Sequence, residues 1–212
     1  MRRILYSLIG SVALTAAAHA WTVTILNSQG QLDPGAVITN VPAIVIANPL
    51  PQVTFLTAAG NPNPILVGDG TNFTSGVYNA AYSIAADPGD GALTGFTFIV
   101  SGFVQGNARI DWQKVVVDTA TNNVLYSAAG SFAGAGQGGF DGAFTLNISA
   151  TLAALASSVA VLETFTLSAG SAPGFDTASL LLVEQDWVPE PASLVALGAG
   201  LAGLVGLRRR VR

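Results

Sequence analysis

Hydrophobic and polar residues alternate along much of the chain between Trp21 and Trp187. The clearest case is the stretch from Phe144 to Leu152, where every second residue is apolar and the residues between are Thr, Asn or Ser. Successive side chains of a β-strand point to opposite faces, so this pattern predicts a strand with one buried and one solvated face. Similar patterns predict further strands at 21–25, 43–46, 53–56, 77–84, 96–104, 110–117, 124–126, 161–167 and 180–183.

Short strands separated by clusters of Gly, Pro, Asn and Asp predict an all-β domain over residues 21–187, either an antiparallel β-sandwich or a jelly roll. The segment Ala150–Ala160 is rich in Ala and Leu, which favours a helix, but it continues directly from the alternating strand. We expect a strand that runs into a turn. The run Gly130–Gly142 is expected to be a loop, because its many glycines disfavour a regular strand.

The first twenty residues follow a different pattern. Arg2 and Arg3 precede a mostly apolar run, which ends in a tripeptide with the small residues Ala18 and Ala20 at its outer positions. This order predicts a secretory signal peptide that is cleaved after Ala20. An uncleaved membrane helix is the alternative, disfavoured because the apolar run is short and ends in a cleavage-type tripeptide.

At the other end of the chain, the pattern of residues 188–212 predicts a membrane segment. An uncharged apolar stretch covers 192–207, and its sixteen residues would form a helix about 24 Å long, shorter than a hydrocarbon core of roughly 30 Å. We therefore expect a single transmembrane helix that spans with local thinning of the bilayer. Basic residues after the stretch favour a cytoplasmic C-terminus and an exported body; these are Arg208, Arg209, Arg210 and Arg212.

Pro189-Glu190-Pro191, the apolar stretch and the arginine-rich tail follow one another in an order that resembles the sorting domain of PEP-CTERM proteins of Gram-negative bacteria. The resemblance covers residues 188–212. It implies recognition by an exosortase, a membrane-embedded cysteine transpeptidase or protease, with processing near the Pro-Glu-Pro motif. It also implies an association with exopolysaccharide and biofilm matrix. The two prolines resist helix formation, which would keep the motif extended and accessible at the membrane surface.

The composition of residues 21–187 excludes several classes of function. Two basic residues, Arg109 and Lys114, stand against eleven acidic ones, a net charge of −9 that excludes nucleic-acid binding through a basic surface. The chain has no cysteine, and its one histidine, His19, lies in the predicted signal peptide. Disulfides, Cys/His zinc sites and Ser–His or Cys–His relays are therefore excluded from the mature chain.

Two tight turns concentrate oxygen ligands of the kind that calcium prefers. One contains Asp69, and the other contains Asp87 and Asp90. Calcium is the one cofactor that the sequence suggests, although neither turn has the spacing of an EF-hand. Turn chemistry also accounts for these residues without a metal.

A row of polar residues in the predicted strand 110–117 and just before it is the candidate ligand face. The alternation places Trp112 on the core face, although a tryptophan is an obvious platform for a sugar. Arg109, Asp111 and Gln113 point the other way, as a row that binds a ligand or simply faces solvent. An exposed aromatic residue beside this row would favour glycan binding.

Two enzymatic alternatives depend on carboxylates. A glycoside hydrolase needs only two suitably spaced carboxylates, and Glu163 alternates with the apolar residues Val161 and Phe165. Enclosure would raise the pKa of Glu163, whereas a position at the rim of the sandwich would not. Asp118 and Asp176 each precede Thr-Ala, where aspartic-protease loops have glycine after the Asp-Thr pair, so a protease is disfavoured.

The sequence thus predicts an exported protein of the cell surface or biofilm matrix with a structural or adhesive, non-catalytic role. An extracellular lectin-like module is the alternative, and a carboxylate-dependent glycosidase is less favoured. The expected partners are an exosortase, the membrane, and exopolysaccharide or further copies of the chain. The expected location is an inner-membrane precursor and then the cell surface or matrix.

Overall fold

The structure is a computed structural model, and it describes residues 20–68, 70–87, 91–170 and 175–190. This part of the chain is built from β-strands and two single 3-10 turns, η1 (Thr57–Ala59) and η2 (Ala135–Gln137), which confirms the all-β prediction. The strands are β1 (Trp21–Asp33), β2 (Val37–Asn40), β3 (Ala43–Ile46), β4 (Gln52–Phe55), β5 (Leu66–Gly68), β6 (Ser75–Ala86), β7 (Leu93–Gln105), β8 (Arg109–Asp118), β9 (Val124–Ala133), β10 (Gly142–Ala156), β11 (Ser158–Ser168) and β12 (Thr177–Pro189).

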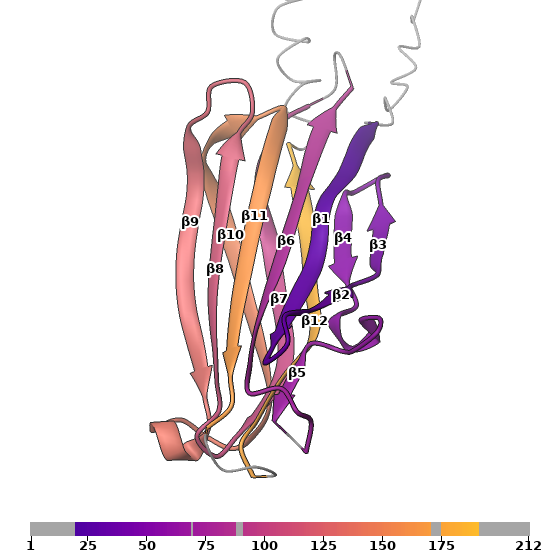
Figure 1. Cartoon of the computed structure of the whole chain (residues 1–212). Helices are drawn as coiled ribbons and strands as arrows, with labels where there is room; N and C mark the ends of the chain where they lie inside the picture. Colours follow the sequence, from indigo (N-terminus) through magenta and orange to yellow (C-terminus); the bar gives the residue numbers. More distant parts are fainter. Residues whose placement is uncertain (1–19, 69, 88–90, 171–174, 191–212) are drawn as a thin grey trace, which may run out of the picture.

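The strands form two antiparallel sheets that face each other (Figure 1). The first sheet has the order β2-β1-β6-β11-β8-β9. The second has the order β10-β7-β12-β4-β3, and β5 pairs with the start of β12. The predicted sandwich is therefore confirmed.

Eight of these strands pair in a nested order. The hairpin β8–β9 lies innermost, and around it β7 pairs with β10, β6 with β11, and β4 with β12. Successive nested pairs alternate between the two sheets, which is the strand order of a jelly roll. β1 and β2 extend one sheet and β3 extends the other.

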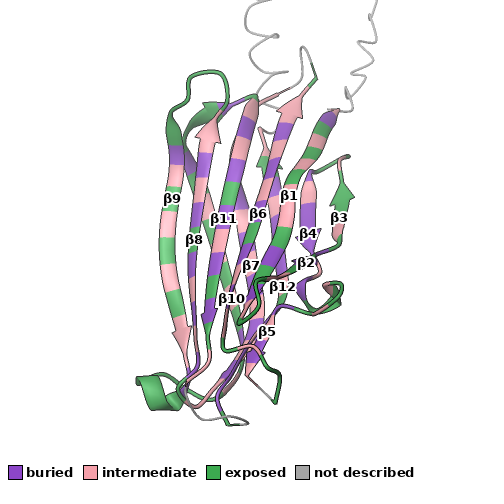
Figure 2. Cartoon of the chain, viewed as in Figure 1, coloured by how far each residue is buried: buried purple, intermediate pink, exposed green. Residues whose placement is uncertain are grey.

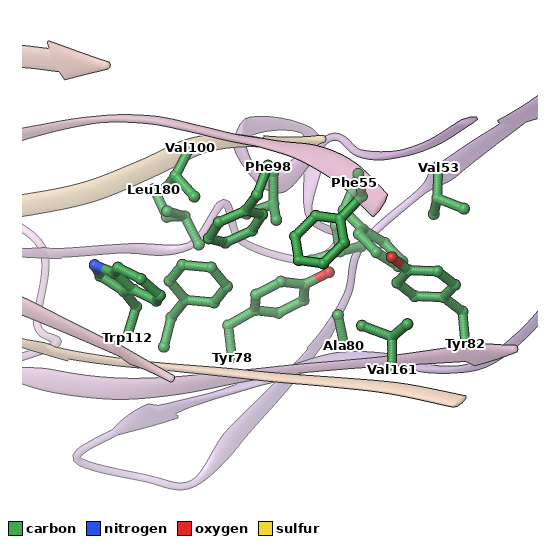
Figure 3. Close-up of a cluster of buried hydrophobic side chains, with 14 of the residues drawn as sticks. Val53, Phe55, Tyr78, Ala80, Tyr82, Phe98, Val100, Trp112, Val161 and Leu180 are labelled. Atoms are coloured by element: carbon green, nitrogen blue, oxygen red, sulfur yellow. The ribbon is translucent and has the colours of Figure 1, made fainter. Parts of the chain in front are cut away.

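The core lies between the sheets, and alternation of side chains fills it. Along most of β6, β8 and β11, and along β7 from Phe96 onward, every second residue is buried, which appears as alternating bands in Figure 2. Aromatic rings from the two sheets meet in the middle (Figure 3). The rings of Phe55 and Tyr78 lie 6.3 Å apart, and those of Phe98 and Trp112 lie 5.5 Å apart.

Both ends of the described chain lie at the same end of the sandwich. The backbone N–H of Asp87 donates to the carbonyl of Ala20, and the N–H of Glu190 donates to the carbonyl of Ala92. Since residues 87 and 92 flank the connection between β6 and β7, we call this the terminal end. The opposite end, here the far end, carries the connections from β7 to β8, β9 to β10 and β11 to β12.

The structure corrects the predicted loop over 130–142. Residues 130–133 belong to β9, and Gly130 lies opposite Trp112 of β8. A Cβ atom at Gly130 would lie 2.7 Å from the indole nitrogen of Trp112, so the glycine gives the indole room to cover the neighbouring strand. The rest of the run forms η2 and the turn into β10.

Other differences from the prediction are small. β10 continues to Ala156 and β11 begins at Ser158, so the segment 150–160 is strand and tight turn, as predicted. The short strands β2 and β5 were not predicted. β12 continues through Pro189, two residues beyond the predicted end of the domain.

Candidate functional site

The candidate ligand row lies on the outer face of the first sheet. Arg109, Asp111 and Gln113 alternate on β8 with buried residues, and Trp112 is only 7% exposed on the core face, as predicted. Arg109 and Asp111 form an ion pair, with 2.8 Å from Nε to Oδ1 and 2.7 Å from Nη2 to Oδ1. Hydrogen bonding to Asp111 raises the pKa of Arg109, so its guanidinium stays charged.

The residues that flank this row on the neighbouring strands are small or carry hydroxyl groups. They are Ala129, Ser131 and Ala133 on β9, and Thr164, Thr166 and Ser168 on β11. The backbone of an exposed aromatic residue runs beside the far end of the row. The backbone N–H of Phe140 donates to the carbonyl of Ala133, the cross-strand partner of Arg109, at 3.0 Å, and Phe140 is 52% exposed.

A line of amide and hydroxyl side chains continues the row across the first sheet. Asn40, Gln29, Asn79, Thr164 and Gln113 occupy opposite positions on five neighbouring strands. Gln29 donates to Asn40 at 3.1 Å, and Thr164 donates to Asn79 at 3.0 Å. The line presents neutral hydrogen-bonding groups to solvent.

The outer face of the second sheet is also rich in hydroxyl groups. Ser101 and Thr145 are hydrogen-bonded across β7 and β10 at 3.2 Å. A shallow groove of about 400 Å³ opens on this face near the terminal end. Its lining residues are Thr94, Gly95, Phe96, Thr97, Ser149, Ala150, Thr151 and Val188.

Two opposite charges are enclosed in the core between the sheets. Lys114 and Glu163 have fully buried side chains and form an ion pair. Gln185 of the other sheet donates to the second carboxylate oxygen of Glu163 at 3.1 Å, and the ammonium of Lys114 lies 4.5 Å from the ring centre of Phe98. Burial lowers the pKa of Lys114 and raises that of Glu163, and the charge of the partner opposes both effects.

This geometry places Glu163 in the core and not at the rim of the sandwich. With an exposed fraction of 1%, Glu163 is closed to a sugar substrate. The alternation around Glu163 was one half of a sequence signal for this pair, and the phase of Lys114 was the half that the prediction missed. Lys114 is in phase with Trp112, as Glu163 is with Phe165, so both charged residues were due to point inward.

The two Asp-Thr pairs do not meet. Asp118 lies at the terminal end, where its carboxylate accepts the N–H of Ala120 in the β8–β9 turn. Asp176 lies at the far end, where its carboxylate accepts the N–H of Asn107 at 2.8 Å. Because β8 separates the two ends, an aspartic-protease dyad of these residues is excluded.

The calcium prediction stays a prediction. Asp69 and Asp90 lie outside the described residues. Asp87 lies at the terminal end, and its backbone bonds to Ala20. No cluster of three metal-binding side chains occurs within the ranges that the structure covers.

The start of the predicted sorting segment is part of the sandwich. Val188 and Pro189 are the last residues of β12, and Pro189 lies opposite Leu93 of β7. The hydroxyl of Thr94 donates to the carbonyl of Val188 at 2.9 Å, and the N–H of Glu190 donates to the carbonyl of Ala92 at 2.7 Å. The segment is extended here, as expected, but it is held against β7.

Comparison with known families settles what this segment is. The family model described as the PEP-CTERM protein-sorting motif matches residues 188–210. The chain carries a PEP-CTERM sorting motif. The resemblance seen in the sequence is thereby confirmed.

The PEP-CTERM motif indicates an exported, sorted protein, and it implies processing by an exosortase. Most of the motif lies beyond Glu190 and so outside the described residues, as do Ala18, Pro191 and the four arginines Arg208, Arg209, Arg210 and Arg212. Within 20–190, apart from the gaps named above, no helical segment has the length and apolarity that a bilayer crossing requires. The predicted transmembrane helix at 192–207 lies outside that range.

Comparison with known proteins says little about the function of residues 21–187, the body that precedes the PEP-CTERM motif. No curated protein matches the chain. Among solved structures, the CBM36-1 domain of a multidomain xylanase from the hindgut metagenome of Trinervitermes trinervoides is 10% identical with a TM-score of 0.26, over 78% of this chain and 95% of that one. The xylan-binding module CBM15 is 12% identical with a TM-score of 0.31, over 80% of this chain and 99% of that one. Likenesses this weak transfer no ligand.

Proposed function

We propose that this PEP-CTERM protein is a non-catalytic structural or adhesive component of the cell surface or biofilm matrix, delivered there by an exosortase. The position of the sorting motif supports this proposal. The motif begins inside β12 at the terminal end, and β1 begins at the same end. The far end and both outer faces therefore point away from the site of processing.

The shape of the body fits a structural role. β1 alone has 13 residues, which at about 3.3 Å per residue give a sandwich roughly 40 Å long. Its outer faces carry rows of hydroxyl and amide groups, and the buried Lys114 and Glu163 are paired with each other. Such a body offers extended polar surfaces.

A glycan-binding module in the same location is the second candidate. The approach of the exposed residue Phe140 to the row of Arg109, Asp111 and Gln113 favours it. A sugar site combines an aromatic residue with a few polar side chains, and the Phe140 backbone brings an aromatic residue to this end of the row. In this candidate, the far half of the first sheet is the ligand face.

The experiment is to produce the full chain in an exosortase-bearing Gram-negative host and to follow it by cell fractionation. The processed protein is expected in the surface and matrix fractions, whereas a variant that lacks Pro189, Glu190 and Pro191 should stay with the membrane. Equal distribution of the two forms would refute delivery by sorting.

Retention on the host exopolysaccharide, with and without EDTA, separates the two candidates. Saturable retention that Phe140→Ala weakens, but that Phe175→Ala does not, would favour the glycan-binding module; Phe175 is the matched control, since it is exposed and also lies at the far end. Loss of retention in EDTA would assign calcium to the aspartate turns. Absence of retention would favour the structural role.

A further inference from the structure

A long uncharged segment forms one side of the sandwich. Between Asp33 and Asp69, 35 consecutive residues contain no charged side chain, although residues 21–187 together carry a net charge of −9. This segment supplies β2, the last strand of the first sheet, and β3, the last strand of the second. The two strands lie on the same side of the molecule (Figure 1), where β1 contacts β3.

The same side exposes large apolar side chains. Ile44, Val45 and Ile46 are consecutive residues of β3, and they are 50%, 39% and 45% exposed. Ile38 of β2 and Leu50, just after β3, are 49% and 58% exposed. An uncovered apolar edge strand is a template for pairing with another strand.

We propose that a second copy of this chain binds here, with β3 of one copy pairing antiparallel to β3 of the other. The inference rests on the proposed matrix role, in which many copies gather at one surface. Residues 21–187 carry a net charge of −9, so two copies of this part of the chain repel each other over most of their surfaces. The uncharged side is where two such copies can approach closely.

The short length of β3, and the two-fold symmetry of a strand paired with its own copy, also favour a second copy as the partner. β3 has four residues and lies between Pro42 and Pro49, so it can accept only a short partner strand. An antiparallel pair of identical strands is related by a two-fold axis, so each copy provides the same surface and the contact closes as a dimer.

The backbone fixes where the axis would pass. Leu56 donates to the carbonyl of Pro42, so by antiparallel alternation Ile44 and Ile46 bond to β4. The N–H and C=O of Val45 then point to the free edge. Pairing Val45 with its own copy places Ile44 of each strand opposite Ile46 of the other, which covers both apolar side chains.

A single cysteine tests this geometry, because the chain has none of its own. The variant Val45→Cys is made in the full chain and oxidised mildly on the producing cells. It should form a disulfide-linked species of twice the monomer mass, because directly opposite residues of an antiparallel pair lie within disulfide range. Ser131→Cys is the control, an exposed position on β9, the opposite edge of the first sheet. At least a tenfold excess of dimer for Val45→Cys is expected.

Equal cross-linking of the two variants, or none at Val45, would overturn the inference, and an adduct of another mass would assign the edge to a different partner. Adding Ile44→Lys to Val45→Cys should abolish the dimer, because it brings like charges together across the axis; a dimer that persists also overturns the inference.

Fractionation of the same cells separates the two proposals. Variants that reach the matrix without a disulfide dimer refute this pairing alone, whereas absence from the matrix refutes the proposed function.

Discussion

Lys114 of β8 and Glu163 of β11 occupy directly opposite positions in an antiparallel strand pair, and their charges meet inside the core. Each charge loses its water on burial, and the partner charge, Gln185 and the rings of Phe96 and Phe98 lie in its place. A buried pair of this kind contributes little net stability, but the loss of one partner is costly. We therefore expect the pair to specify the register of β8 against β11 more than to strengthen the fold.

The first prediction is that Glu163→Gln strongly destabilises the protein. The amide has nearly the same size but leaves the ammonium of Lys114 buried without a counter-charge, so the free energy of unfolding should fall by about 3–5 kcal/mol. Urea unfolding followed by tryptophan fluorescence measures it.

Two further variants define the cause of that loss. Glu184→Gln, a half-exposed acid on the outer face of β12, is the control, and its effect should stay within about 0.5 kcal/mol. The double variant Lys114→Met, Glu163→Leu should recover most of the stability, because it removes both buried charges. A double variant as unstable as Glu163→Gln would contradict this account.

The second prediction concerns pH. Burial lowers the pKa of Lys114 below its ordinary value of 10.5. As the pH rises, the folded chain therefore loses this proton before the unfolded chain does. The contribution of Lys114 to the free energy of unfolding is fully present above pH 10.5. It is lost as the pH falls through the lower pKa that Lys114 has in the folded state. In Glu163→Gln the opposing carboxylate is absent and the pKa of Lys114 falls further.

The free energy of unfolding of Glu163→Gln should therefore rise more steeply between pH 7 and pH 10 than that of the unchanged protein. Urea titrations at a series of pH values measure both slopes. Parallel curves would show that Lys114 keeps the same pKa in the variant, against the ion-pair assignment.

Much of the fold could be predicted, because alternation is a local pattern. The stretches around Phe144 and Trp112 alternate over many residues, and both are strands with the predicted faces. β2 and β5 each contain only two adjacent apolar residues, which form neither an alternation nor an apolar run, whereas all four residues of the equally short β3 are apolar. Gly130 misled the prediction because its place in β9 depends on the indole of Trp112, which packs over it from the next strand.

The candidate site was less predictable, for a similar reason. The phase of Lys114 and Glu163 placed both side chains in the core, but their meeting depends on the pairing of two strands that brings together residues 49 positions apart in the sequence. No local pattern records that register. By contrast, the PEP-CTERM motif is a contiguous sequence signal, so it could be recognised at once, whereas its attachment to β7 could not.

The third prediction tests the role of Gly130. In Gly130→Ala the new methyl group would meet the indole of Trp112 at 2.7–2.9 Å, which forces the ring or the strand to move. Such overpacking should cost about 1–3 kcal/mol of unfolding free energy and should change the near-ultraviolet circular dichroism of the tryptophan. Ala129→Ser, on the exposed face of the same strand, is the control. An unchanged spectrum in Gly130→Ala would contradict the contact.

The last prediction concerns the start of the sorting motif. The hydroxyl of Thr94 holds the carbonyl of Val188, and the carbonyl of Ala92 holds the N–H of Glu190, so the first residues of the motif are bound to the sandwich. A protease binds its substrate as a free, extended chain. The end of β12 must therefore separate from β7 before an exosortase can act on it.

Thr94→Val removes the hydroxyl and keeps the shape of the side chain. A hydrogen bond of this kind is worth about 0.5–1.5 kcal/mol, so its loss should raise the population of the released end roughly two- to tenfold. Conversion of the precursor to the processed form, followed by pulse-chase in cells that contain the exosortase, should accelerate accordingly. Thr97→Val is the control, since Thr97 also lies on β7 but its hydroxyl is hydrogen-bonded to Ser149 of β10 at 3.5 Å, whereas the carbonyl of Val188 accepts from Thr94. Equal half-times for the two variants would show that release of the strand end does not limit processing.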